Sequence, residues 1–477
     1  MSSTFDVRIW AIRPYVGTKR TTYTVRWMVA GTEFRRTFVT KSLADGFRAP
    51  LVSAQRQGEP FDTRTGLPEA MRREQIQRIT WYEHAMSFID MKWSGLEGGS
   101  RRTLAESLGT ITCALVDSRN NAPEPKTLYR ALVHWAFNYT AREKGDPPDE
   151  YAAAIAWIAR HSIRLSTFTD PKVARAAYNS TLTAPDGTAL KHTTATNKRR
   201  ALTGAVNYAV ELGLLENDPF KRIHIPRQRR TTTIDRNVVI NPEQARALLK
   251  SIEKQGEIGR RMVAFFATIY FAGLRPGEVV ALRENNLTLP EEGWGELRFY
   301  ESSPYSGSAW TDSGEASPRK ALKHRNKDEC RIVPAHPELV AHLRAHLESF
   351  GTTPDGRLFW NRNGKPLCYG SYSLIWDRAR RSALTAEQYD SPLARRPYDL
   401  RHAAVSTWLN AGVAAPQVAE WAGHTVEILL STYAKCIDGQ QSADCKRIEE
   451  ALGGSEPDET NTDGPPQDLG TADSNDE

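Results

Sequence analysis

The sequence predicts a mainly α-helical, multidomain protein with a small β-rich domain at its N-terminus. The chain has 477 residues, too many for one hydrophobic core, and at roughly 150 residues per domain this suggests about three domains. Apolar and polar residues alternate over residues 5–39, as they do in strands. Helical periods instead fill most of residues 80–216 and 241–452.

Residues 1–65 are predicted to form a three-stranded antiparallel meander followed by a helix. Gly31-Thr32 would supply the turn before the last strand. The expected strands are Val7–Trp10, Tyr23–Trp27 and Phe34–Val39. Nine basic and two acidic residues lie between Val7 and Arg48, so we expect this domain to contact nucleic acid. A small solvated sheet is the alternative.

Residues 75–222 are predicted to form an all-α domain. Its expected helices cover residues 80–93, 100–116, 126–139, 150–161 and 197–212. The last of these ends at Gly213, a residue type that commonly closes a helix. Residues 223–237 follow as a basic linker that could lie along a phosphate backbone.

Residues 238–453 are predicted to form an α+β domain. Asn241-Pro242 begins its first helix as an N-cap followed by proline, and strand-like sequence interrupts the helices at residues 294–333. The longest apolar run, Met262–Leu274, has 13 residues, whereas a bilayer-spanning helix needs about 20. We therefore expect a buried helix there and no membrane contact.

The charge of the chain is divided unevenly. Residues 455–477 contain eight acidic residues and no Lys or Arg, so the net charge of +6 becomes +14 without them. We expect residues 454–477 to be a disordered acidic tail and the basic remainder to bind a polyanion. The five cysteines form no CxxC pair, which favours a reducing, cytoplasmic location without disulfides or zinc.

Two segments contain the residues expected to carry chemistry. In the first, Gly273 permits a sharp turn and Pro276 suits the first turn of a helix, so Arg275 lies at a rigid corner with Glu278 three residues on. The second is Tyr398-Asp-Leu-Arg-His-Ala-Ala-Val-Ser-Thr-Trp-Leu409, followed by Trp421-Ala-Gly-His424 and by Tyr433. Each residue alone would be ordinary, but the combination is not.

This combination suits phosphoryl transfer without a metal or other cofactor. Two guanidiniums, from Arg275 and Arg401, could clamp the non-bridging oxygens of a phosphodiester as they gain charge. Tyr433 could attack the phosphorus and form a phosphotyrosine. A lysine on a strand could protonate the leaving 5′ oxygen.

The strings GLRPGEVVAL, YDLRHAAVSTWL and WAGH, together with Tyr433, resemble the motifs of the tyrosine recombinase (phage integrase) family. The resemblance covers residues 241–436 closely and is greatest for actinobacterial mobile-element integrases. It implies that residues 1–65 bind arm-type DNA sites, that residues 75–222 are the core-binding domain, and that residues 238–453 are the catalytic domain.

The resemblance also implies roles for individual residues. Arg275 and Arg401 would be the catalytic arginines, His424 would hydrogen-bond the scissile phosphate, and Tyr433 would be the nucleophile. Tyr398 stands where the family usually has His, and because a phenol is a poor base at neutral pH we assign it hydrogen bonding and positioning. We expect His402 to face about 100° away from Arg401 and to be structural.

The family places its catalytic lysine in a β-hairpin before a strand that ends in Val-Pro. Here both Lys323 and Lys327 precede Val333-Pro334, and we favour Lys323 because Lys327 resembles an exposed hairpin tip. Further DNA contacts are expected from nine arginines in the N-terminal, helical and linker regions. These are Arg8, Arg26, Arg35, Arg36, Arg199, Arg200, Arg227, Arg229 and Arg230.

The resemblance implies a site-specific recombinase that integrates and excises a mobile element. The expected partners are double-stranded attachment sites, three further copies of the chain in a homotetramer on DNA, and an excision or directionality factor. The alternatives are a chromosome-dimer resolvase, a catalytically inactive DNA-binding relative, and a topoisomerase of related chemistry. The basic N-terminal sheet favours the integrase over the resolvase.

Overall fold

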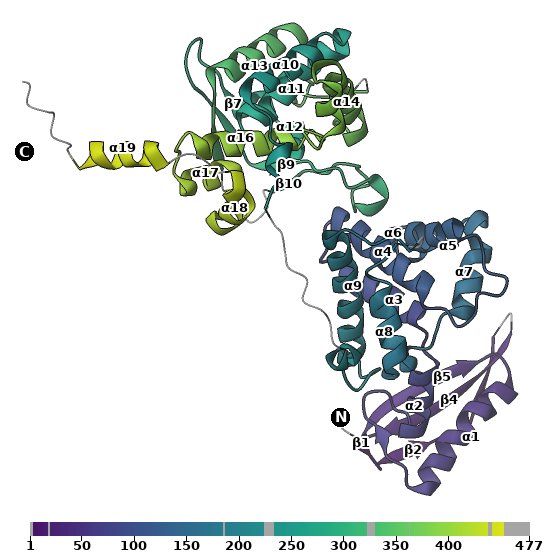
Figure 1. Ribbon diagram of the computed structural model, residues 1–477. Helices are drawn as coiled ribbons and strands as arrows, with labels where there is room; N and C mark the ends of the chain where they lie inside the picture. The colour runs from purple at the N-terminus through teal and green to yellow at the C-terminus, as the bar shows by residue number, and fades with distance from the viewer. Residues whose placement is uncertain are drawn as a thin grey trace, which may run out of the picture. The chain divides into compact units, whose positions relative to one another are not determined.

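The computed structural model describes residues 3–17, 20–184, 187–223, 233–321, 330–361, 363–436 and 441–452 (Figure 1). The chain packs as two units, of which the first comprises Met1–Gln228 with Tyr305–Pro318 and the second comprises Arg229–Pro304 with Arg319–Glu477. Several predictions fall outside the described residues. They concern Lys323, Lys327, Arg227, Arg229, Arg230 and the acidic tail.

The first unit begins with an antiparallel sheet of four described strands, one more than predicted. β4 (Thr21–Val29) pairs with β5 (Thr32–Phe38) along one edge, and with β2 (Val7–Ile9) and β3 (Arg13–Val16) end to end along the other. Because every residue of β3 is exposed, it lacks the burial alternation that marks a strand in the sequence. Ala30 and Gly31, both with positive φ, form the hairpin turn.

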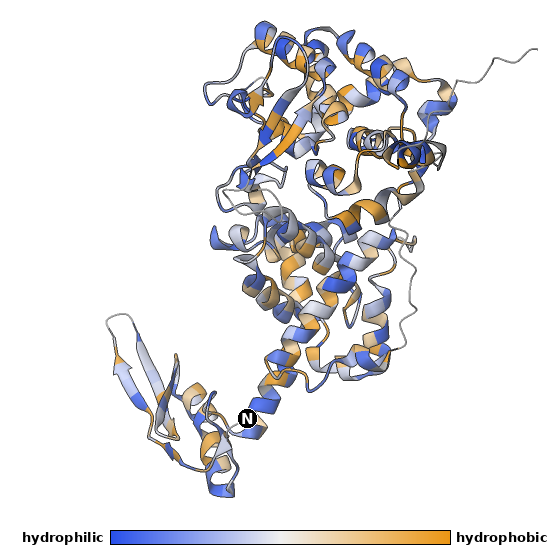
Figure 2. Cartoon of the chain, turned by 90° about the vertical axis from the view of Figure 1, so that its left-hand side faces the viewer, coloured by the Kyte–Doolittle hydropathy of each residue, from blue (hydrophilic) through white to orange (hydrophobic). Residues whose placement is uncertain are grey.

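One face of this sheet is covered by helix α1 (Lys41–Gln57), which Thr40 caps. Val25, Trp27 and Val29 alternate along β4 and are buried with Leu51 of α1. In Figure 2, which colours each residue by its hydropathy, the strands of the N-terminal sheet carry both hydrophobic and hydrophilic residues. The remaining short elements are β1 (Ser3–Thr4), β6 (Phe61–Asp62) and α2 (Glu69–Arg78).

The helical region of the first unit follows the predicted pattern with shifted ends. Its α-helices are α3 (Trp81–Trp93), α4 (Gly98–Ala114), α5 (Pro125–Ala131), α6 (Tyr139–Glu143), α7 (Asp149–His161), α8 (Pro171–Asn179) and α9 (His192–Glu211). The helix predicted over 126–139 ends early because a π-helical turn, Leu132–Ala136, replaces its second half. Helices α2 and α8 were not predicted.

A loop from the sequence of the predicted catalytic domain belongs to this first unit. Tyr305–Pro318 packs on α4, where Trp310 is buried against Trp93. The buried Arg101 guanidinium binds the Asp312 carboxylate at 2.7 Å and the Trp310 carbonyl at 3.3 Å. A Cβ atom at Gly98 would lie only 3.0 Å from the Trp310 carbonyl oxygen, so glycine allows this close approach.

The second unit contains helices around a small sheet, which confirms the predicted combination of helices and strands. Strands β7 (Leu287–Thr288), β8 (Gly295–Phe299) and β11 (Arg331–Ala335) form a sheet in the order β11-β8-β7, while β9 (Glu301–Ser302) pairs with β10 (Lys320–Ala321). The helices are α10 (Pro242–Glu253), α11 (Gly256–Phe271), α12 (Pro276–Ala281), α13 (Pro337–Phe350), α14 (Tyr369–Ala383), α15 (Ala386–Asp390), α16 (Asp399–Asn410), α17 (Ala415–Ala422), α18 (Val426–Tyr433) and α19 (Gln441–Ala451).

Helix α11, the predicted buried helix, is the centre of the second unit. It packs against α10, α13 and α16, and its Phe265, Phe266 and Ile269 are fully buried. The indole of Trp376 stacks on Phe266 with ring centroids 5.2 Å apart. This core fixes the position of the C-terminal end of α11. Arg275, the first candidate site residue along the chain, follows four residues later.

Replacing Trp310 with Ala should release the loop Tyr305–Pro318 from α4. Loss of the buried indole should cost about 2–3 kcal/mol of docking energy, which raises the open population at least about tenfold. Limited proteolysis within Tyr305–Pro318, followed by mass spectrometry, should accelerate by that factor. The exposed Ser308 provides the control, since Ser308→Ala should leave the rate unchanged. Equal cleavage rates in Trp310→Ala and the parent would contradict this account.

Candidate active site

Arg275 lies at the predicted corner between α11 and α12. Gly273 turns the chain with φ of +60°, and a Cβ atom there would lie 2.7 Å from the Trp408 ring. The Glu278 carboxylate accepts hydrogen bonds from both the backbone N–H and Nη1 of Arg275, each at 2.9 Å. The Arg275 side chain remains 32% exposed, so its guanidinium is fixed yet accessible.

Arg401, in the first turn of α16, is fully buried and joins three segments of the second unit. Its Nη1 donates to the Gly273 carbonyl at 2.5 Å and its Nη2 donates to the Ala422 carbonyl at 2.5 Å. Nη2 also lies 2.9 Å from Nε2 of His424. The structure thereby brings together the Arg275 corner, the start of α16 and the end of α17.

His424 follows the left-handed Gly423 that ends α17. Burial, together with the charges of Arg401 and Arg275, lowers the pKa of His424 to about 3, so the imidazole is neutral at pH 7. Because Nε2 accepts from Arg401, the ring proton is on Nδ1. Nδ1 is buried and has no hydrogen-bond partner among the described residues. It is a donor available to an anion.

Tyr433 is the last residue of α18 and is fully buried among Val405, Val418 and Leu429. Its hydroxyl lies 2.9 Å from Nδ1 of His402. Burial is the main cause that raises the pKa of Tyr433 above its ordinary value, so the phenol keeps its proton at neutral pH.

His402, for which we expected a structural role, contacts Tyr433. It does point away from Arg401 around the helix, but α18 packs in that direction and places Tyr433 there. The Tyr398 and His402 rings meet edge to face with centroids 5.1 Å apart. The sequence could have indicated this contact only if the position of α18 had been known.

Tyr398 directly precedes α16 and hydrogen-bonds the side chain of Arg275. This contact agrees with the positioning role expected for it. The phenol thus binds one of the two arginines, whereas its ring packs on His402.

Arg331 is a residue of this cluster that the sequence analysis missed. It lies on β11, is buried, and binds the Glu278 carboxylate at 2.8 Å. Burial would raise the pKa of Glu278, but the guanidiniums of Arg331 and Arg275 outweigh it and lower the pKa to about 2. A sequence signal did exist, because Arg331 shares the buried strand face of Val333 and Ala335.

The arginines expected to contact DNA occupy different surroundings. By strand register Arg8, Arg26 and Arg35 share the outer face of the N-terminal sheet, whereas Arg36 lies on the face that α1 covers. Arg26 is paired with Glu33 at 2.7 Å. On α9, Arg199 contacts Tyr178 and Thr196, while Arg200 is exposed.

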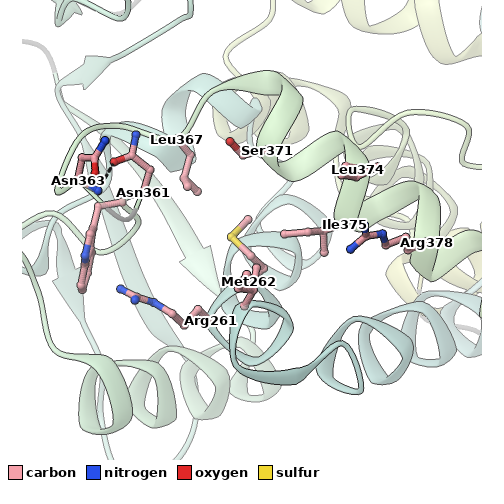
Figure 3. Close-up of a pocket in the computed structure, with 11 residues that line it drawn as sticks. Arg261, Met262, Asn361, Asn363, Leu367, Ser371, Leu374, Ile375 and Arg378 are labelled. Atoms are coloured by element: carbon pink, nitrogen blue, oxygen red, sulfur yellow. Dashed lines mark hydrogen bonds between the residues drawn. The ribbon is translucent and has the colours of Figure 1, made fainter.

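A separate hollow of about 430 Å³ lies between α11, α14 and the segment before α14 (Figure 3). Met262, Leu367, Leu374 and Ile375 give it an apolar lining, with Arg261 and Arg378 at its sides. The residues that line it do not include Arg275, Arg331, Arg401, His424 or Tyr433. Within the described ranges, no His, Cys, Asp or Glu cluster could hold a metal ion, and no helix combines the length and apolarity of a membrane span.

Replacing Glu278 with Gln should destabilise the second unit by about 3–5 kcal/mol at pH 7, because two guanidiniums lose their counter-charge. The pKa of Glu278 in the folded protein is lower than its unfolded value of about 4.3. The ionised carboxylate therefore stabilises the fold fully at pH values above about 4.3, and this stabilisation is lost as the pH falls toward 2. The difference in the free energy of unfolding between the parent and Glu278→Gln should therefore become smaller as the pH falls from 7 to 3. Hydrogen exchange of α11 amides measures it, with the exposed Glu243→Gln as the control. A deficit independent of pH would contradict the ion-pair explanation.

Two solved structures are similar to parts of this chain. The Tn1549 transposon integrase in complex with a circular intermediate DNA matches 65% of this chain and 96% of its own, with 15% identity and a TM-score of 0.44. The XerH site-specific recombinase bound to difH substrate matches 80% of this chain and 96% of its own, with 16% identity and a TM-score of 0.46.

Comparison of the sequence gives one relative and one family match. Tyrosine recombinase XerC of Bacillus pumilus (strain SAFR-032) is 24% identical over 248 residues, which cover 50% of this chain and 68% of that protein. Residues 238–438 match the model of the phage integrase family. The matched segment contains Arg275, Arg331, Arg401, His424 and Tyr433.

Proposed function

We propose that this protein is a site-specific DNA recombinase that cleaves and rejoins strands through a 3′-phosphotyrosine intermediate. The observation that carries the proposal is the convergence of Arg275, Arg401, His424 and Tyr433 from four separate segments. Arg401 contacts the corner before Arg275 and also contacts His424 directly. The family of residues 238–438 supports the same reaction class.

The chemistry follows from the charges of the site. In the transition state the non-bridging oxygens of the phosphate gain negative charge, which the guanidiniums of Arg275 and Arg401 and the free Nδ1–H of His424 can stabilise. The Tyr433 oxygen forms the new bond to phosphorus, and the bond to the 5′ oxygen breaks. Lys323 is proposed to give that oxygen its proton.

The proposed substrate is double-stranded DNA at the ends of a mobile element, which the protein integrates and excises. The outer face of the N-terminal sheet, with Arg8 and Arg35 exposed, suits contact with phosphates at arm-type sites. Arg200 on α9 and the basic linker suit contact with the core site. A homotetramer on DNA, an excision factor and a cytoplasmic location complete the proposal.

Full burial of Tyr433 has a consequence for this mechanism. A phosphodiester cannot reach an oxygen inside the packed contact of α16, α17 and α18. DNA binding must therefore shift α18 far enough to admit the phosphate. The same burial is compatible with a catalytically inactive relative, and adduct formation separates the two.

A nicked duplex that traps the cleaved strand tests the nucleophile. A DNA sequence that the full-length protein binds can first be selected from random duplexes and then used for this nicked substrate. The parent protein should give an SDS-stable protein–DNA adduct, whereas Tyr433→Phe should give none, because the attacking oxygen is missing. Tyr305→Phe, at an exposed tyrosine, is the matched control and should form the adduct normally. Adduct formation by Tyr433→Phe would refute the proposed nucleophile.

A substrate in which sulfur replaces the leaving 5′ oxygen tests which lysine is the general acid. A thiolate leaves without protonation, so Lys323→Ala should cleave the ordinary duplex at least about 100-fold more slowly and the sulfur duplex at nearly the parental rate. Lys327→Ala should cleave both normally. The opposite pattern for the two variants would assign the acid to Lys327.

A further inference from the structure

The hydroxyl of Tyr433 has one hydrogen-bond partner among the described residues, and it is His402. The oxygen lies 2.9 Å from Nδ1 of His402, and the two rings meet at a centroid distance of 5.7 Å. If Tyr433 attacks a phosphate, its proton must leave as the new bond forms. The structure therefore raises the question of which group receives that proton.

The other basic groups of the cluster are already occupied. Tyr398 hydrogen-bonds Arg275, and Nε2 of His424 accepts from Arg401. The Glu278 carboxylate is held between Arg275 and Arg331. Among the described residues, only Nδ1 of His402 lies within hydrogen-bond distance of the Tyr433 oxygen.

We propose that His402 is the general base of the reaction, a catalytic residue that takes the proton of Tyr433 during cleavage and returns it during rejoining. This inference rests on the proposed strand-transfer function and deepens it. In cleavage the Tyr433 O–H bond breaks, Nδ1 of His402 gains the proton, the O–P bond forms and the P–O5′ bond breaks. The 5′ oxygen takes its proton from the acid described above, and rejoining reverses each step.

The packing around His402 supports this role. The ring lies between Tyr398 and Tyr433 and meets each edge to face, which fixes its orientation. Tyr398 directly precedes α16 and His402 lies in its first turn, and their rings are in contact.

The surroundings of His402 keep it ready to accept a proton. Burial is the main cause that lowers the pKa of His402 to about 4; Arg401 and Arg396 act in the same direction, and Asp399 opposes them. The imidazole is therefore neutral at pH 7, with Nδ1 free when Nε2 carries the ring proton. A bound phosphate would offset the charges of Arg275 and Arg401, which makes His402 a stronger base at the moment of attack.

The test uses the full-length protein and the nicked duplex of the preceding section, under single-turnover conditions. His402→Asn keeps a hydrogen-bond acceptor near the position of Nδ1 but cannot take a proton at neutral pH. We expect it to slow adduct formation at least about 100-fold while DNA binding stays within about twofold of the parent. His336→Asn, which preserves an N-cap at α13 away from the cluster, should react at the parental rate.

Chemical rescue separates a base from a structural residue. Added imidazole should restore adduct formation to His402→Ala, and substituted imidazoles of higher pKa should restore it more strongly. A parental rate for His402→Asn would overturn the inference, as would failure of every imidazole to rescue a His402→Ala protein that melts at the parental temperature. If the parent itself forms no adduct, the proposed function fails instead.

Discussion

A single buried carboxylate, that of Glu278, organises the candidate active site. Glu278 binds Arg275, which directly precedes α12, and Arg331 from β11, so one negative charge balances two guanidiniums that would otherwise repel each other. An isolated charge in such a place is costly, and only the paired arrangement makes it stable. Because the same carboxylate also accepts the Arg275 backbone N–H, it sets both the corner of the chain and the direction of its side chain.

The proposed nucleophile Tyr433 and its proposed proton acceptor His402 depend on this framework through Arg401. That side chain donates to carbonyls at the ends of α11 and α17, which places α17 and the following α18 against α16. Tyr433 then meets His402 inside an apolar contact. In this arrangement the Tyr433 phenol is buried and keeps its proton.

Much of the fold was predictable from local patterns. Helical periods located α3, α4, α7 and α11, and strand alternation located β4 and β5, because these elements each bury one regular face. The exposed strand β3 and the helices α2 and α8 escaped prediction. The π-helical turn after α5 also escaped, since its register depends on packing with its neighbours and not on its own residues.

The sequence by itself determined which residues are the candidates for the chemistry, because Arg275, Arg401, His424 and Tyr433 stand in motifs with recognisable spacing. Only the tertiary structure decided which of them touch. The contacts of His402 with Tyr433, of Arg331 with Glu278, and of Tyr305–Pro318 with α4 join residues far apart in the chain. Local periodicity gives the face on which a side chain lies, whereas its partner is set by the packing of whole elements.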